Sequence, residues 1–97
     1  MKKIFYASLC YEGIRGGAIG IRNDAVIYRN QTLTLPDEYK NIVMPFTDIR
    51  KVEKGRLFLF PAITIYLKND SSYKFIVFNR EGFFKALQSV SNESEKW

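Results

Sequence analysis

The sequence predicts a mainly β fold, a bent antiparallel barrel of about seven short strands closed by one C-terminal helix. Three observations predict it. Apolar and polar residues alternate over short runs, turn-forming residues recur about every ten positions, and the apolar period becomes helical after Asn79. The chain has 97 residues, of which 46% are hydrophobic, so residues 1–97 can close one core as a single domain.

The first half of the chain contains a hairpin centred on Asn23 and Asp24, because short polar side chains tolerate the left-handed backbone of a tight turn. Before it, Gly13, Gly16 and Gly17 are expected to break the first strand, since glycine adopts angles that other residues avoid. The predicted strands of this half cover residues 4–12, 18–22, 25–31 and 41–46, with a further short strand at 32–35 left open.

The second half alternates more cleanly and then changes period. Strands are predicted at 48–54, 62–68 and 73–78, and in the second of these Ile63, Ile65 and Leu67 share one face. Asn79 is the predicted N-cap of the helix, with Glu81 in its first turn. The helix carries an apolar stripe formed by Phe83, Phe84, Leu87 and Val90. The polar residues 91–97 are predicted to be a flexible tail.

Three segments follow one another in the order of a known superfold. Residues 17–28 combine a glycine-led strand, a polar turn and a second apolar strand. Residues 42–52 place Met44-Pro45 ahead of Asp48-Ile49, and residues 63–84 form a closing hairpin that leads into the helix. Together they resemble the GRAM and bacterial PH groups of the PH-like superfold, over roughly residues 17 to 89.

This resemblance implies a barrel with a C-terminal helix at one open end, and a role in binding rather than catalysis. PH-like domains bind phosphoinositides, peptides or other domains, so the fold alone does not choose a ligand. Their phosphoinositide signature is a basic first inter-strand loop. Here that loop, residues 12–17, offers only Arg15 beside Glu12, which argues against stereospecific phosphoinositide binding. Peptide-binding relatives imply a groove between the helix and residues 48–54.

The residue inventory gives little support to catalysis, so we expect no enzyme, no cofactor and no metal. Histidine is absent, and a single cysteine excludes multi-cysteine zinc sites and an internal disulfide. Asp48 and Glu53 have no carboxylate partner at a defined spacing, and Cys10 lies in an apolar strand where cysteine behaves as a small hydrophobe.

The net charge of +5 is scattered except for one basic cluster, formed by Arg50, Lys51, Lys54 and Arg56. Two interpretations stay open. The cluster is a solvated strand edge, or it contacts phosphate, above all the headgroups of an anionic membrane. A nucleic-acid partner is not favoured, because the tyrosine and lysine pairs Tyr66/Lys68 and Tyr73/Lys74 lack an RNP-like motif around them.

The segment Leu57, Phe58, Leu59 and Phe60 is unusual, because four large apolar residues occupy a position where a turn is expected to be polar. Three interpretations stay open, which are a strand extension buried against the helix or against the connection at residues 32–41, a subunit interface, and a loop that enters a membrane. We therefore predict a binding or scaffolding module that contacts a protein partner or a second copy of itself through residues 57–60. The alternative is a peripheral module that binds anionic lipid weakly.

We expect a cytoplasmic protein of bacterial type. The apolar run before Cys10 is shorter than a signal peptide requires, and no run approaches the length of a membrane span. One unpaired cysteine is typical of a reducing compartment.

Overall fold

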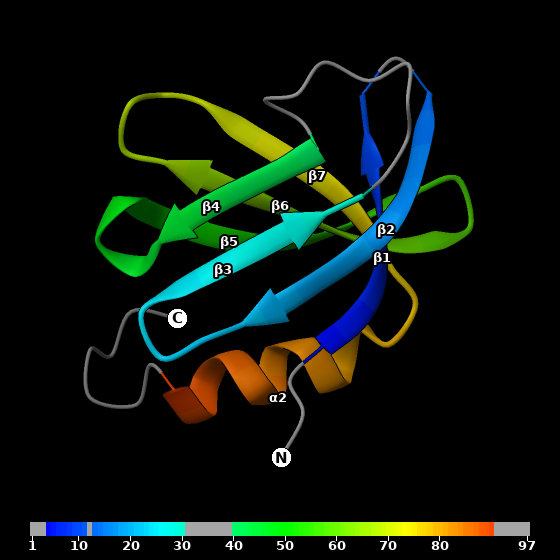
Figure 1. Ribbon diagram of the computed structural model, residues 1–97. Coiled ribbons are helices and arrows are strands. Elements are labelled where there is room, and N and C mark those ends of the chain that lie inside the picture. The colour runs from blue at the N-terminus through cyan, green and yellow to red at the C-terminus, as the bar shows by residue number, and fades with distance from the viewer. Residues whose placement is uncertain (1–3, 12, 31–39, 91–97) are drawn as a thin grey trace.

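A computed structural model describes residues 4–11, 13–30 and 40–90, which form one curled sheet of seven antiparallel strands and one helix (Figure 1). The fold class predicted from the sequence is therefore confirmed. The elements are β1 (Ile4–Cys10), β2 (Ile14–Ile21), β3 (Ala25–Arg29), β4 (Asn41–Pro45), a 3-10 turn η1 (Phe46–Asp48), β5 (Ile49–Leu57), β6 (Phe60–Leu67), β7 (Ser72–Val77) and α2 (Arg80–Val90). The expected tail at 91–97 and short strand at 32–35 lie outside the described residues.

The strands follow the order β4-β3-β2-β1-β7-β6-β5, so the first strand lies in the middle of the sheet and pairs with the last. Ala7 lies opposite both Gly17 of β2 and Val77 of β7. The sheet is a half-barrel, and in the part of the chain that the structure describes its two edges are β4 and β5. β1 pairs with β2 on one side and with β7 on the other, so it is part of this sheet.

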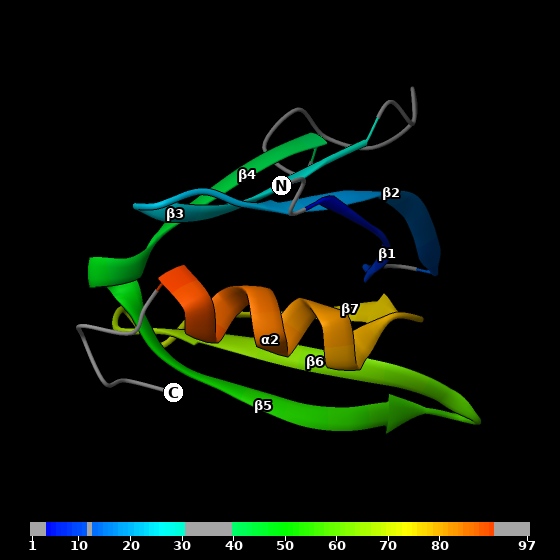
Figure 2. The ribbon, with the colours of Figure 1, turned by 90° about the horizontal axis from the view of Figure 1, so that it is seen from below.

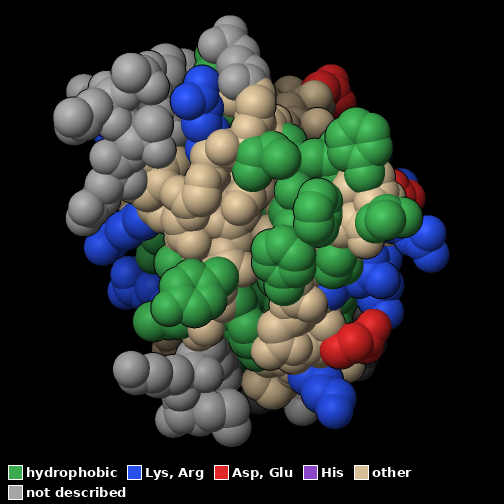
Figure 3. All heavy atoms as spheres, turned by 90° about the vertical axis from the view of Figure 1, so that its right-hand side faces the viewer, with side chains coloured by type: hydrophobic (Ala, Val, Ile, Leu, Met, Phe, Trp, Pro, Cys, Tyr) green, Lys and Arg blue, Asp and Glu red, His purple; other side chains and the backbone are tan. Residues whose placement is uncertain are grey.

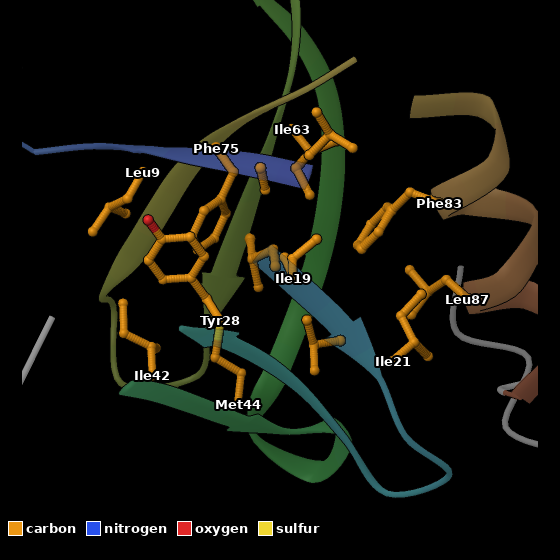
Figure 4. Packing of buried hydrophobic residues seen from close by; sticks show 14 of the residues in the cluster. Leu9, Ile19, Ile21, Tyr28, Ile42, Met44, Ile63, Phe75, Phe83 and Leu87 are labelled. Carbon is orange, nitrogen blue, oxygen red and sulfur yellow. The ribbon is translucent and has the colours of Figure 1, made fainter. Parts of the chain in front are cut away.

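The core lies between the two curled halves of the sheet, where α2 fills the opening between β1–β4 and β5–β7 (Figure 2). Alternate residues of each strand point inward, so Ile63 and Ile65 of β6 are fully buried, as predicted. Phe83 and Leu87 of α2 belong to the same buried cluster (Figure 4). Phe5 of β1 meets the Phe83 ring edge-on, with ring centroids 5.9 Å apart. The helix thus joins the two halves through one apolar stripe.

The predicted N-cap of α2 is present. The Asn79 side-chain oxygen accepts a hydrogen bond from the backbone N–H of Gly82 at 3.2 Å. This bond satisfies one of the donors that a helix leaves free at its N-terminus. Within residues 4–11, 13–30 and 40–90, no helix combines the length and the apolar character needed to cross a membrane.

Two predicted glycine breaks are wrong. Gly16 and Gly17 lie inside β2, and the turn before it is made by Gly13, whose φ is +116°. Gly17 is needed for close approach instead, because a Cβ there would overlap the carbonyl oxygen of Arg29 and come within 2.9 Å of the Tyr28 hydroxyl. The strand continues through these residues because extended backbone is open to glycine as well.

The predicted turn at residues 55–61 is also corrected. β5 runs on to Leu57 and β6 begins at Phe60, so only Phe58 and Leu59 remain as the turn. Apolar side chains and β-branched neighbours favour extended pairing, and they lengthen both strands beyond the sequence prediction. A long two-stranded hairpin results, and its turn lies at the right-hand side of Figure 1.

Candidate functional site

The turn between β5 and β6 presents two apolar residues to solvent. Phe58 is 86% exposed and Leu59 is 90% exposed. Of the alternatives drawn from the sequence, strand extension is confirmed, but burial of this segment against the helix is wrong at these two positions. Phe58 also has a φ of 56°, in the left-handed region, where two-residue hairpin turns prefer glycine or asparagine.

Strand register places three further aromatic residues beside the turn. Ala62 pairs with Ile76 across β6 and β7, so Phe60 and Phe78 lie opposite each other two positions along, with ring centroids 5.6 Å apart. Ala7 pairs with Val77 across β1 and β7, so the next position along brings Tyr6 beside Phe78. Ala7 and Val77 are buried in the core, and their neighbours therefore point to the outside of the sheet.

We call this surface the aromatic face, and it consists of Tyr6, Phe58, Leu59, Phe60 and Phe78. Tyr6 is 88% exposed, Phe78 64% and Phe60 40%. Figure 3 views the molecule from the right-hand side of Figure 1 and shows hydrophobic side chains gathered over this side. β1, the β5–β6 hairpin and the residue after β7 therefore contribute to one exposed apolar surface.

Cations are attached to the base of the same hairpin. The Lys74 Nζ donates a hydrogen bond to the Arg56 carbonyl oxygen at 3.0 Å, and an Arg80 guanidinium nitrogen donates to the Gly55 carbonyl oxygen at 2.6 Å. These acceptors are neutral carbonyl groups, so neither bond cancels the positive charge of its donor. Arg56 itself is exposed. The hairpin is thus apolar at its turn and positive at its base.

The basic cluster predicted from the sequence is divided by the structure. Arg50 and Lys51 lie near the other end of β5, where both are close to the Tyr66 ring, with the Lys51 Nζ 5.0 Å from the ring centroid. Lys54 points toward α2, with its Nζ 3.6 Å from a Glu81 carboxylate oxygen and 5.2 Å from the Phe84 ring centroid. Of the four predicted cations, only Arg56 and Lys54 lie toward the aromatic hairpin.

Glu53 offsets part of the charge at the far end of β5. Its carboxylate lies 3.3 Å from the Lys51 Nζ and accepts a hydrogen bond from the Tyr66 hydroxyl at 3.1 Å. Hydrogen bonds from Lys51 and then Tyr66 lower the pKa of this carboxyl. Tyr66 is therefore engaged with charged neighbours, and Tyr73 packs against the core near Phe75.

The sequence-based reasoning missed Tyr6, Phe78, Lys74 and Arg80. A signal was present for the first two, because both have outward parity in strands whose inward residues are apolar. The missing information was the pairing of β1 with β7, which brings the beginning of the chain beside its last strand.

The structure also describes Cys10 and Arg15, which the sequence analysis considered. Cys10 is partly exposed, and burial raises the pKa of its thiol while nearby Lys74 lowers it to a smaller extent. Arg15, expected in the first inter-strand loop, lies in β2 and donates a hydrogen bond to the Tyr11 carbonyl oxygen at 3.2 Å. A cavity of about 350 Å³ at the far end of β6 is lined by Asp48, Leu67, Lys68 and Asn69. Among the described residues, no three acidic or thiol side chains gather in a way that could hold a metal ion.

Comparison with known proteins supports the fold and leaves the function open. No family model matches the chain, and no curated protein matches it. One similar solved structure is the C-terminal domain of an unknown protein from Leishmania infantum, with a TM-score of 0.75 and 13% sequence identity. The match covers 91% of this chain and 80% of that one. At this identity the likeness concerns the arrangement of the strands and the helix alone.

Proposed function

We propose that this chain is a non-enzymatic contact module and that the aromatic face is the surface by which it docks. The observation that carries the proposal is the exposure of five large side chains on one side of the sheet, none of which the core requires. Soluble proteins seldom expose contiguous apolar surface of this kind without a binding role.

The size of the aromatic face fits docking. A buried phenylalanine or tyrosine contributes roughly 150–250 Å², so the five mostly exposed residues offer on the order of 600 Å². That value reaches the upper end of the largest patches on typical monomers, roughly 300–600 Å². A stable protein interface uses about 800 Å² from each partner. The aromatic face and its charged margin together are sufficient for specific contact.

Two classes of partner follow from two observations. The extent of the aromatic face supports contact with another protein or a second copy, as the sequence predicts. The cations at the base of the hairpin support the alternative, a peripheral role on an anionic membrane.

The order of seven strands and a helix supports kinship with GRAM-type PH-like domains, and we retain a bacterial, cytoplasmic setting as part of the proposal.

Site-specific photo-crosslinking in cells tests the docking role. Benzoylphenylalanine is placed at Leu59 and, as a matched control, at Val43, which is exposed on β4 away from the aromatic face. We expect adducts with protein or lipid from position 59 and few from position 43, and we expect Phe78→Ser to reduce the former. Equal adducts at both positions, or none at either, would contradict the proposal.

A further inference from the structure

We infer that the partner of the aromatic face is the surface of an anionic lipid bilayer, with the Phe58–Leu59 turn inserted at the boundary between headgroups and acyl chains. The inference rests on the proposed docking role and assigns its partner. Three features of the hairpin support the inference. They are its shape, the sign of its charge, and the spacing between its charged and apolar parts.

The shape of the hairpin favours insertion over burial in a flat interface. The β5–β6 turn projects from the body of the molecule in two views related by a right-angle rotation (Figures 1 and 2). Phe58 and Leu59, two of the three most exposed large hydrophobic residues in the described part of the chain, are at its apex. A protein partner would need a matching apolar pocket to accept such a protrusion, whereas a bilayer accepts it without a preformed cavity.

The charge around the hairpin favours an anionic surface. Between Glu53 and Glu81 the sequence contains five cations and a single acidic residue, Asp70. Lys68 lies in the same turn as Asp70, and Lys54 is paired with Glu81, which leaves three cations near the hairpin. Asp70 belongs to the turn at the opposite end of β6, about 25 Å away for an eight-residue strand. Lys74 and Arg80 are held to the hairpin by neutral carbonyl groups, and Arg56 adds a third cation. Each cation near an anionic membrane strengthens binding about fivefold.

The distance between charge and apolar tip matches the depth of a peripheral element. Arg56 is two residues before Phe58, which corresponds to about 7 Å along a strand. Apolar faces of interfacial elements reach roughly 5–10 Å below the headgroups. Arg56 and Lys74 can therefore remain among lipid phosphates while the turn enters the acyl boundary. Tyr6, with its apolar ring and polar hydroxyl, suits the interface between the two regions.

A second copy of this chain is a weaker occupant. A two-fold contact through the aromatic face would bring together the positive margins of two copies, each with Arg56 and Lys74. In the described part of the hairpin and of α2, the acidic residues Glu53 and Glu81 are already paired with Lys51 and Lys54. An acidic protein with an apolar pocket is the remaining occupant, and the experiment below distinguishes it from a membrane.

Vesicle co-sedimentation tests the inference, with vesicles of phosphatidylcholine alone or mixed with phosphatidylserine, at low and physiological salt. We expect binding to the mixed vesicles that weakens as salt rises. The double variant Phe58→Asn with Leu59→Ser should lower the partition constant at least tenfold, and Arg56→Gln about fivefold. Val43→Ser and Lys68→Gln are matched controls distant from the hairpin and should change it less than twofold. Circular dichroism melting establishes that every variant is folded.

A depth measurement separates insertion from adsorption. Tryptophan replaces Leu59 in a Trp97→Phe background, with Val43→Trp as its control, and brominated acyl chains act as quenchers. Quenching confined to position 59 supports insertion.

Binding without such quenching, or binding that Phe58→Asn with Leu59→Ser leaves intact, overturns the inference of an inserted turn. Absence of vesicle binding while Leu59 still forms protein adducts in cells also overturns it and indicates an acidic protein partner. Absence of both binding and adducts overturns the docking role as well.

Discussion

Phenylalanine is used in opposite ways on the two sides of the curled sheet. Phe83 is 0% exposed and lies between the two halves, whereas Phe58 is 86% exposed at the end of a hairpin. Folding accounts for the first, because burying such a ring stabilises the core. Folding does not account for the second, which leaves its ring in water and adopts an unfavourable backbone angle. The difference separates residues that build the fold from residues available for docking.

The largest expected effect on stability comes from truncating Phe83, the buried phenylalanine. Phe83→Ala removes a ring that contacts both Phe5 and Phe84, and we expect the free energy of unfolding to fall by about 3–5 kcal/mol. Phe78→Ala is the matched control on the aromatic face and should cost less than about 1 kcal/mol, since this side chain is 64% exposed and its ring pair with Phe60 lies at the surface. Urea denaturation measures both, and similar losses for the two variants would remove the distinction.

A second test uses two adjacent glycines of β2. Gly17→Ala should destabilise the protein by about 3 kcal/mol, because the added methyl group meets the backbone of β3 and cannot be accommodated by a side-chain rotation. Gly16→Ala has nothing within 4 Å of the added Cβ and should change stability by less than about 0.5 kcal/mol. Equal effects in thermal melting would show that strand conformation, and not close approach, decides the requirement at residue 17.

The buried hydroxyl of Tyr28 provides a smaller effect. It donates a hydrogen bond to the Arg15 carbonyl oxygen at 2.6 Å and accepts one from the Asn30 side-chain amide at 3.1 Å. Tyr28→Phe keeps the ring against Phe75 but removes both bonds, and we expect a loss of about 1–2 kcal/mol. Tyr28→Leu should lose more, because the ring contact also disappears. A Tyr28→Phe protein as stable as the parent would show that these bonds contribute nothing net.

The same residue predicts a dependence on alkaline pH. Burial raises the pKa of the Tyr28 hydroxyl, with a smaller opposing effect from its hydrogen bond with Asn30. The unfolded chain releases this proton near pH 10, whereas the folded chain retains it to higher pH. The contribution to stability is therefore complete below about pH 10 and is lost as pH rises through the folded pKa. The decline in melting temperature above pH 10 should be shallower in Tyr28→Phe than in the parent.

The buried face of the sheet could be predicted from the sequence, because it depends on patterns within short segments of the chain. Alternation at Ile63 and Ile65 gives the buried face, and Asn79 gives the start of the helix. Only part of the aromatic face could be predicted from the sequence. Residues 57–60 attracted attention by composition, but alternation says nothing about exposure within a turn, and Tyr6 meets Phe78 only through long-range pairing of β1 with β7. The hydrogen bond from Lys74 to Arg56 depends on how a long side chain bends, which no spacing specifies.

The smallest effect has the opposite sign and concerns the two turns at the ends of β6. Phe58 and Asp70 both have left-handed backbones, with φ values of 56° and 72°. Aspartate and asparagine tolerate that region, whereas phenylalanine does not. Phe58→Asn should therefore stabilise the fold by about 0.5–1 kcal/mol, and Asp70→Phe should destabilise it by a similar amount.

The variant Phe58→Asn compares the requirements of folding with those of docking at the hairpin apex. A residue that stability alone favours at position 58 is polar or small, so retaining an exposed phenylalanine there opposes folding. If Phe58→Asn raises the melting temperature and weakens vesicle binding, stability and docking change in opposite directions at one side chain. A Phe58→Asn protein that is less stable than the parent would mean that the ring contributes to the fold after all, and the aromatic face would then lose its clearest member.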